Sequence, residues 1–135
     1  MVRGVFACLT SVVLCMGGAL CVRPVYAHHS ASSEFDVERT IKITGVLTKM
    51  EWINPHAYMH LDVPDASGKA TQWDIEFAGL SKLRLAGMDR QSLVVGQKYV
   101  AIGNPSKQGK NMILINKLIF PDGHVFVLSG QDASQ

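Results

Sequence analysis

Hydrophobic and polar residues alternate over much of the chain after residue 39, which is the pattern of strands with one buried face. The alternation is clearest over residues 57–63 and 72–77. The sequence Asp-Ala-Ser-Gly at 65–68 separates these two segments and is typical of a turn. We therefore expect the two segments to form a β-hairpin.

Other segments with many β-branched or aliphatic residues predict further strands. The first covers residues 40–48 and contains Gly45, and a glycine inside a strand commonly marks a bulge or a bend. Two more strands are predicted at 96–103 and 112–120, and a short one at 124–128. Leucines from position 80 onward predict a short helix that Gly87 ends, because glycine tolerates the left-handed conformation at a helix exit.

The order of these elements predicts the fold class. Three strands, a short helix and two strands, with the first strand bent at a glycine, is the element order of an OB-fold, a five-stranded closed barrel. We therefore expect an all-β domain with one short helix, an OB-fold-like barrel over residues 39–130. The alternative is an open β-sandwich, because strand order alone is compatible with both.

The N-terminal segment, residues 1–27, has the features of a cleaved signal peptide. Arg3 precedes an apolar stretch, and Val25 and Ala27 supply the small side chains that signal peptidase requires before the cut. The apolar residues 5–22 are just long enough for a retained membrane anchor, which is the rival interpretation. We expect cleavage before His28, export to the periplasm, and no membrane span afterwards.

Cleavage would change the chemistry of the chain. Cys8, Cys15 and Cys21 are its three cysteines, so the mature domain would have no thiol for a disulfide, a nucleophile or a soft metal site. Loss of Arg3 and Arg23 would reduce Lys plus Arg from 13 to 11, which equals the 11 Asp plus Glu. Because nucleic-acid binders present a basic surface, a neutral domain disfavours that class of partner.

The polar residues 28–38 predict a flexible N-terminal arm, in which Phe35 is the apolar anchor. Cleavage would give His28 a free α-amine beside its own imidazole. Both groups can be deprotonated near neutral pH and could chelate Cu(II), or another divalent metal ion such as Ni(II) or Zn(II). His29 and His56 are candidate further ligands, and a cut after Tyr26 would place His29 third from the amine, which is another good chelate.

Several polar residues could support such a site or bind a partner. On a strand, His56 and His60 would share one face about 13 Å apart, too far to bind one ion unless the strand bends. His60 is expected to pair across the hairpin with Asp74 or Glu76. Glu51 could accept a hydrogen bond from a metal-bound imidazole.

The corner between the first two strands contains Trp52, Asn54 and Pro55. We expect Trp52 to pack, Asn54 to bond its own backbone, and Pro55 to fix φ. Tyr58 and His56 belong to a barrel face on which OB-folds commonly bind ligands. His124, next to a turn glycine, is expected to be exposed.

Several short pieces of the mature chain match a known protein family: His28-His29-Ser30, Phe35-Asp36, Gly45-Val46, Glu51-Trp52-Ile53-Asn54-Pro55-His56, Trp73 with Glu76, and Pro121-Asp122-Gly123. On these pieces the chain resembles a family of exported bacterial proteins known only as a domain of unknown function. The resemblance spans the mature chain, and the Trp-Ile-Asn-Pro-His segment is its most specific part. The resemblance implies export and a small barrel, and it implies no established activity.

No nucleophile motif, phosphate-binding loop, recognisable pair of catalytic carboxylates or zinc-protease signature is present, so the sequence does not support an enzymatic activity. The predicted function is that of a small periplasmic binding protein that holds copper or another divalent metal through its mature N-terminal histidine. The alternative is a metal-free envelope interaction module that binds a peptide, a glycan or a protein on the barrel face.

Overall fold

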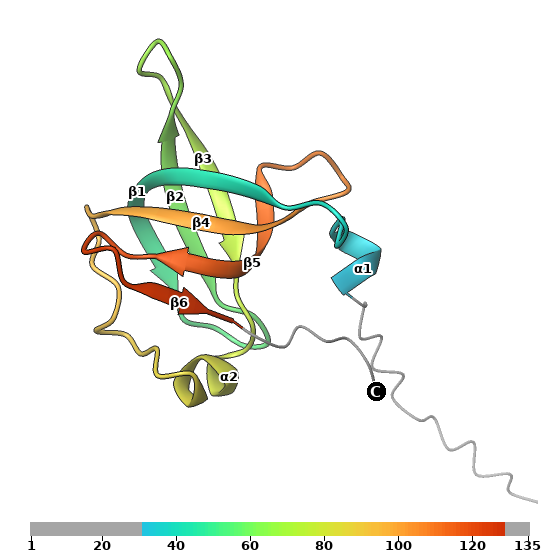
Figure 1. The fold of residues 1–135 in the computed structure, drawn as a ribbon, viewed down its shortest axis with the longest axis vertical. Coiled ribbons are helices and arrows are strands. Elements are labelled where there is room, and N and C mark those ends of the chain that lie inside the picture. The colour runs from blue at the N-terminus through green and yellow to red at the C-terminus, as the bar shows by residue number, and fades with distance from the viewer. Residues whose placement is uncertain (1–30, 129–135) are drawn as a thin grey trace, which may run out of the picture.

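This computed structural model describes residues 31–128 of the chain, and these form a single sheet that curls into a barrel (Figure 1). All neighbouring strands in the order β3-β2-β1-β4-β5-β6 are antiparallel. The elements are α1 (Ala31–Glu34), β1 (Ile41–Glu51), β2 (Tyr58–Pro64), β3 (Ala70–Glu76), α2 (Leu80–Leu85), β4 (Lys98–Pro105), β5 (Met112–Ile119) and β6 (Val125–Val127).

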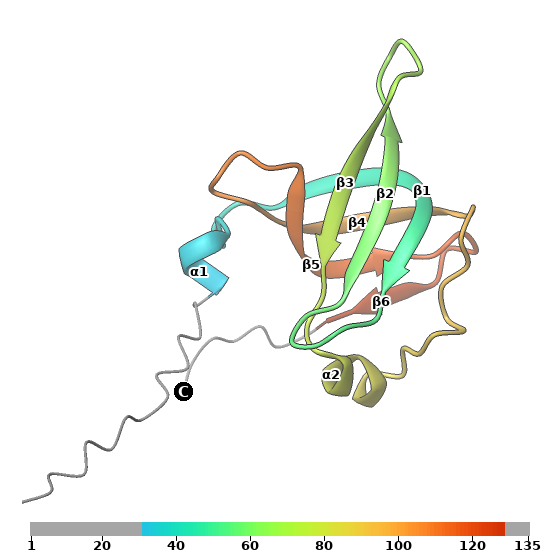
Figure 2. The ribbon, with the colours of Figure 1, turned by 180° about the vertical axis from the view of Figure 1, so that it is seen from behind.

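A parallel pairing of β3 with β5 closes the barrel. Ile75 of β3 is the register partner of Ile113 of β5, and the pairing extends one residue to each side. Five strands thus form a closed ring, and α2 lies between β3 and β4 in the chain and at one end of the barrel (Figures 1 and 2). The predicted OB-fold-like barrel is confirmed, and the closing pair excludes the open β-sandwich.

Strand β1 bends because it changes partners along its length. Residues 41–46 pair with β4, and residues 46–51 pair with β2. At the crossover, a Cβ on Gly45 would lie 2.7 Å from the backbone oxygen of Asp62, so only glycine allows the two strands to approach this closely. The bulge predicted for this strand comes later, in a register shift that follows Leu47.

The barrel interior contains the apolar residues of the predicted alternation. In β2, Met59 and Leu61 are fully buried, and the residues that alternate with them, Tyr58, His60 and Asp62, are more exposed. The helix α2 adds Leu83, which is also fully buried, and so closes one end of the core. Each such side chain stabilises the fold by about 1.5–3 kcal/mol through removal from water. No helix among residues 31–128 is both long enough and apolar enough to cross a membrane.

The N-terminal arm is attached to the barrel from Ala31 onward. Phe35 is only 2% exposed and forms a β-bridge with Ser106, and the next backbone N–H donates to the oxygen of Pro105 at 2.9 Å. On the other side, the backbone N–H of Lys107 donates to the oxygen of Glu34 at 2.9 Å. The flexible arm predicted for residues 28–38 is therefore fixed over its described part, because Phe35 has a buried position to occupy. The predicted signal peptide, His28 and His29 lie outside the described residues.

Candidate functional site

The outer face of the β2–β3 hairpin carries most of the residues that the sequence singled out. Since alternate residues of a strand point to opposite faces, the buried residues of β2 and β3 leave polar neighbours outside. These neighbours stand opposite each other as three cross-strand pairs: Tyr58 with Glu76, His60 with Asp74, and Asp62 with Gln72. Four of these six side chains are acidic or histidine residues on neighbouring rungs, and Glu76 is the one of the six that is buried.

His56 and Glu76 form the most distinctive contact at one end of this face. His56 precedes β2, and the N–H of Phe77 donates to the oxygen of Ala57 at 2.8 Å, which holds the preceding loop against the end of β3. His56 Nδ1 contacts the carboxylate of Glu76. Glu76 is only 5% exposed, whereas the His56 side chain is about half exposed. Burial raises the pKa of Glu76, and the adjacent His56 ring opposes this shift.

The charge of Glu34 in the N-terminal arm acts on Tyr58 as well as on Glu76. Burial raises the pKa of the Tyr58 phenol, and the negative charge of Glu76 raises it further. The charge of Glu34, in α1, raises the pKa values of both Tyr58 and Glu76. Helix α1 therefore lies within electrostatic range of the His56–Glu76 contact, although Glu34 is 22 positions before His56 and 42 before Glu76 in the sequence.

His60, on the same face, contacts other residues than His56 does. Its Nδ1 atom lies 2.7 Å from Oδ1 of Asp74, which confirms the predicted cross-strand pair. Gln72 Nε2 donates to the same oxygen at 3.0 Å. His60 Nε2 is buried and has no hydrogen bond within the described part of the chain, but it faces Oε1 of Glu51 at 3.5 Å. The contacts of His60 are thus the ones expected of a side chain that joins strands.

One expectation for this face is wrong, and one stays a prediction. Glu51, a candidate acceptor for a metal-bound imidazole, contacts Lys49 and faces His60. The hydrogen bond with Lys49 lowers the pKa of Glu51. The carboxylate beside His56 is that of Glu76. In addition, His56 is not on the strand, so the spacing of about 13 Å from His60 along one strand does not apply.

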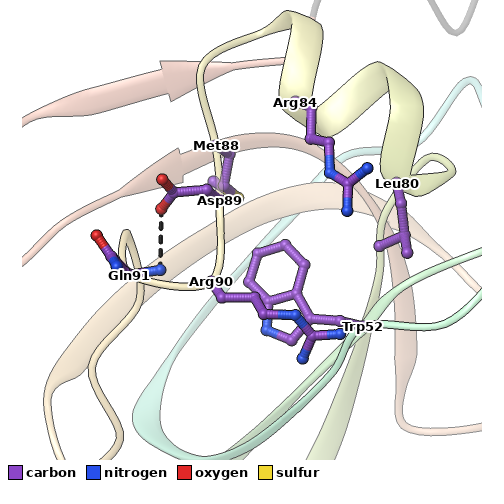
Figure 3. A pocket seen from close by; sticks show the side chains of 7 residues that line it. All are labelled: Trp52, Leu80, Arg84, Met88, Asp89, Arg90 and Gln91. Atoms are coloured by element: carbon purple, nitrogen blue, oxygen red, sulfur yellow. Dashed lines mark hydrogen bonds between the residues drawn. The ribbon is translucent and has the colours of Figure 1, made fainter.

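The loop that carries His56 also forms one wall of a cavity of about 240 Å³ (Figure 3). Trp52, at the start of the loop, packs against the core as predicted and lines this cavity. Arg90 places its guanidinium carbon 5.9 Å from the centre of the Trp52 ring. Residues of α2 and the segment after it complete the lining. Sequence reasoning missed this cavity, because no pattern indicated that Arg84 and Arg90 approach Trp52 from separate segments.

The described residues alone do not form a complete metal centre. Within residues 31–128, no group of three or more His, Cys, Asp or Glu side chains is arranged to hold a metal ion. His56 and Glu76 make a two-residue contact, and the other predicted ligands, His28 and His29, lie in the part of the chain that the structure does not describe. His124 is exposed, as predicted, and its ring packs edge-on against Phe120 with centroids 5.5 Å apart.

These features define a small OB-fold-like barrel with an acidic, histidine-containing outer face on its β2–β3 hairpin. By its sequence, the chain belongs to the DUF6152 family, a family of unknown function, whose model matches residues 18–115. The resemblance to a domain of unknown function is thereby confirmed.

Two solved structures illustrate what the fold is similar to. The dimeric N-terminal domain of PriB from Thermoanaerobacter tencongensis is 23% identical, with a TM-score of 0.36 over 50% of this chain and 74% of that one. A chain from the structure of yeast Stn1 and Ten1 is 16% identical, with a TM-score of 0.38 over 67% of this chain and 43% of that one. No curated protein matches the sequence.

Proposed function

We propose that the protein is an exported, periplasmic binding protein that holds copper, or another divalent metal ion, between its mature N-terminus and His56. Cleavage after Ala27 would give His28 two nitrogen ligands, its α-amine and its imidazole. His56 would supply a further imidazole, and His29 is a candidate for another. The observation that carries the proposal is the attachment of the arm to the barrel, because the charge of Glu34 in the attached arm acts on Glu76, the contact partner of His56.

The reach of the arm is compatible with such a site. Phe35 fixes α1 on the barrel, and the charge of Glu34 acts on Glu76, which contacts His56, and on Tyr58, the register partner of Glu76. His28 is three positions before Ala31, the first described residue. An extended chain of three residues spans about 10 Å. His28 would therefore lie within about 10 Å of Ala31.

The environment of His56 fits the role of a metal ligand. A metal-bound histidine usually donates its second ring N–H to a carboxylate or a carbonyl group, which fixes the ring and increases its basicity. Glu76 is such a carboxylate at Nδ1 of His56, and its burial keeps it in place. This contact is made by Nδ1, so Nε2 of the half-exposed His56 ring remains available to bind a metal ion. Glu34 and Glu76 add negative charge that would favour a bound cation.

The type of ligand atom favours copper among the divalent metals. A domain without thiols can offer amine and imidazole nitrogen atoms, for which Cu(II) has the highest affinity of the common divalent ions. The same face disfavours a nucleic acid, since Glu51, Asp62, Asp74 and Glu76 would repel phosphate groups.

A second candidate is a metal-free module that docks a peptide, a glycan or an envelope protein on the same face. The position of Tyr58 favours it, because this half-buried phenol stands among polar side chains on the part of an OB barrel that commonly binds ligands. Under this alternative, Tyr58→Ala would abolish capture of the partner, and a chelator would change nothing.

The metal proposal predicts that Cu(II) raises the melting temperature of the mature protein, residues 28–135 with a free α-amine. Binding at 100 times the dissociation constant would stabilise the fold by about 2.7 kcal/mol. His28→Ala and His56→Ala should each weaken Cu(II) binding at least about tenfold, measured by calorimetric titration. His124→Ala is the matched control and should bind Cu(II) normally, because the edge-on contact with Phe120 places this exposed ring elsewhere. The proposal would be overturned if Cu(II) did not raise the melting temperature, or if His28→Ala bound Cu(II) with unchanged affinity.

A further inference from the structure

We propose that the cavity between the 52–57 loop and α2 binds a small organic carboxylate, with Trp52 against its apolar body and the guanidinium groups of Arg84 and Arg90 on its charged end. This site is separate from the proposed metal site, because Trp52 lines the cavity, whereas His56 does not line it and contacts Glu76. The proposal therefore does not depend on metal binding.

The two arginines give the cavity its charge. Arg84 extends from α2 toward the Trp52 ring, and Arg90 crosses the ring from the segment that follows the helix (Figure 3). Within residues 31–128, neither guanidinium forms an ion pair with a carboxylate. A guanidinium presents a planar fork of N–H donors that matches the two oxygen atoms of a carboxylate.

The acidic residue in the cavity is already engaged. Asp89 Oδ1 accepts hydrogen bonds from the backbone N–H groups of Gln91, at 2.9 Å, and of Ser92, at 3.0 Å, and from the Ser92 hydroxyl at 2.9 Å. These bonds, of which the hydroxyl bond has the largest effect, lower the pKa of Asp89. Asp89 is thus used to shape the loop, and the two arginines give the cavity a net positive charge.

The remaining walls of the cavity are apolar, so they favour an anion that also has an apolar part. Trp52, Leu80 and Met88 are hydrophobic and at least partly buried. The volume of about 240 Å³ is slightly below the range of about 300–1,000 Å³ that holds drug-sized ligands, so a molecule of about one ring would fit. A bare inorganic anion would leave these apolar walls unused.

The test is a titration with sodium benzoate, followed by the fluorescence of Trp52. The chain has two tryptophans, so the titration uses the Trp73→Phe protein, in which Trp52 is the only one left. We expect a saturable change, and binding weakened about tenfold or more in Arg84→Gln and in Arg90→Gln. Lys82→Gln is the matched control on α2, since Lys82 is exposed and does not line the cavity, and it should leave the affinity unchanged.

Two competitors decide which part of the ligand is recognised. Benzamide has the same ring without the charge, and inorganic phosphate has charge without the ring, so neither should compete with benzoate at equal concentration. A non-saturable response, equal binding of benzamide or phosphate, or unchanged affinity in both arginine variants would overturn the proposal. If Trp73→Phe does not fold, the two indole N–H signals of the unmodified protein in NMR spectra, assigned with Trp52→Phe, give the same readout.

Discussion

Replacing Gly103 with alanine is expected to destabilise the barrel by about 3 kcal/mol or more, because there is no space for a side chain. A Cβ at this position would lie 2.0 Å from the carbonyl oxygen of Leu114 and 2.8 Å from its carbonyl carbon. Both atoms belong to the backbone of the paired strand, so they cannot move without disrupting the β4–β5 ladder. Unfolding in urea, followed by circular dichroism, measures the loss.

The local register explains why the strands approach so closely there. Ile102 pairs with Lys117, but Gly103 pairs with Ile115, so Asn116 is an extra residue in β5. The Asn116 side chain donates to Oδ1 of Asn104 at 3.0 Å, which ties the bulge to β4. The control is Gly109→Ala, which has open space around it and should cost only about 1–2 kcal/mol through its φ of 68°. Equal losses for the two variants would contradict this explanation.

Replacing Phe35 with alanine is expected to have the second large effect, a loss of about 3 kcal/mol in the free energy of unfolding. The side chain is 2% exposed and anchors the arm to the β4–β5 loop, where Lys107 Nζ also donates to the backbone oxygen of Ser32 at 2.7 Å. If the arm brings His28 to His56, this variant should also bind Cu(II) more weakly. Urea unfolding and a Cu(II) titration measure the two effects.

Val37→Ala is the matched control for Phe35, because Val37 follows it closely in the chain and is 50% exposed. A change at such a surface position should alter the stability by no more than about 0.5 kcal/mol. A Phe35→Ala protein with nearly unchanged stability would show that the arm is not anchored in this way. Normal Cu(II) affinity in that variant would contradict the link between the anchor and the metal site.

The fold could be predicted from the sequence wherever local patterns determine it. The β2–β3 hairpin was predicted at 57–63 and 72–77 and is found at Tyr58–Pro64 and Ala70–Glu76, because alternation and a turn specify it. The predicted start of β4 at Gly96 was two residues early, since Gly96 adopts a φ of 88° before the strand begins. The parallel β3–β5 pairing joins segments far apart in the chain, and no local pattern indicates it.

The contacts of the candidate site, too, were predictable only where a local pattern determines them. The pair of His60 and Asp74 follows from cross-strand register in a hairpin, so it was predictable. The contact of His56 with Glu76 was not, because His56 lies in a loop whose path depends on packing against the end of β3 and on Gly79. A Cβ on Gly79 would lie 2.8 Å from the backbone oxygen of Pro55. The arginines around Trp52 likewise meet only through tertiary structure.

The most direct test of the central claim is the intact mass of the protein, purified from the periplasm under native conditions after growth with copper. The mass reports the first residue and any bound metal ion together. The account predicts a chain that begins at His28 and carries one copper ion, and a His56→Ala chain that begins at the same residue without it. A chain that retains residues 1–27, or a mature chain with no metal ion, would contradict the account.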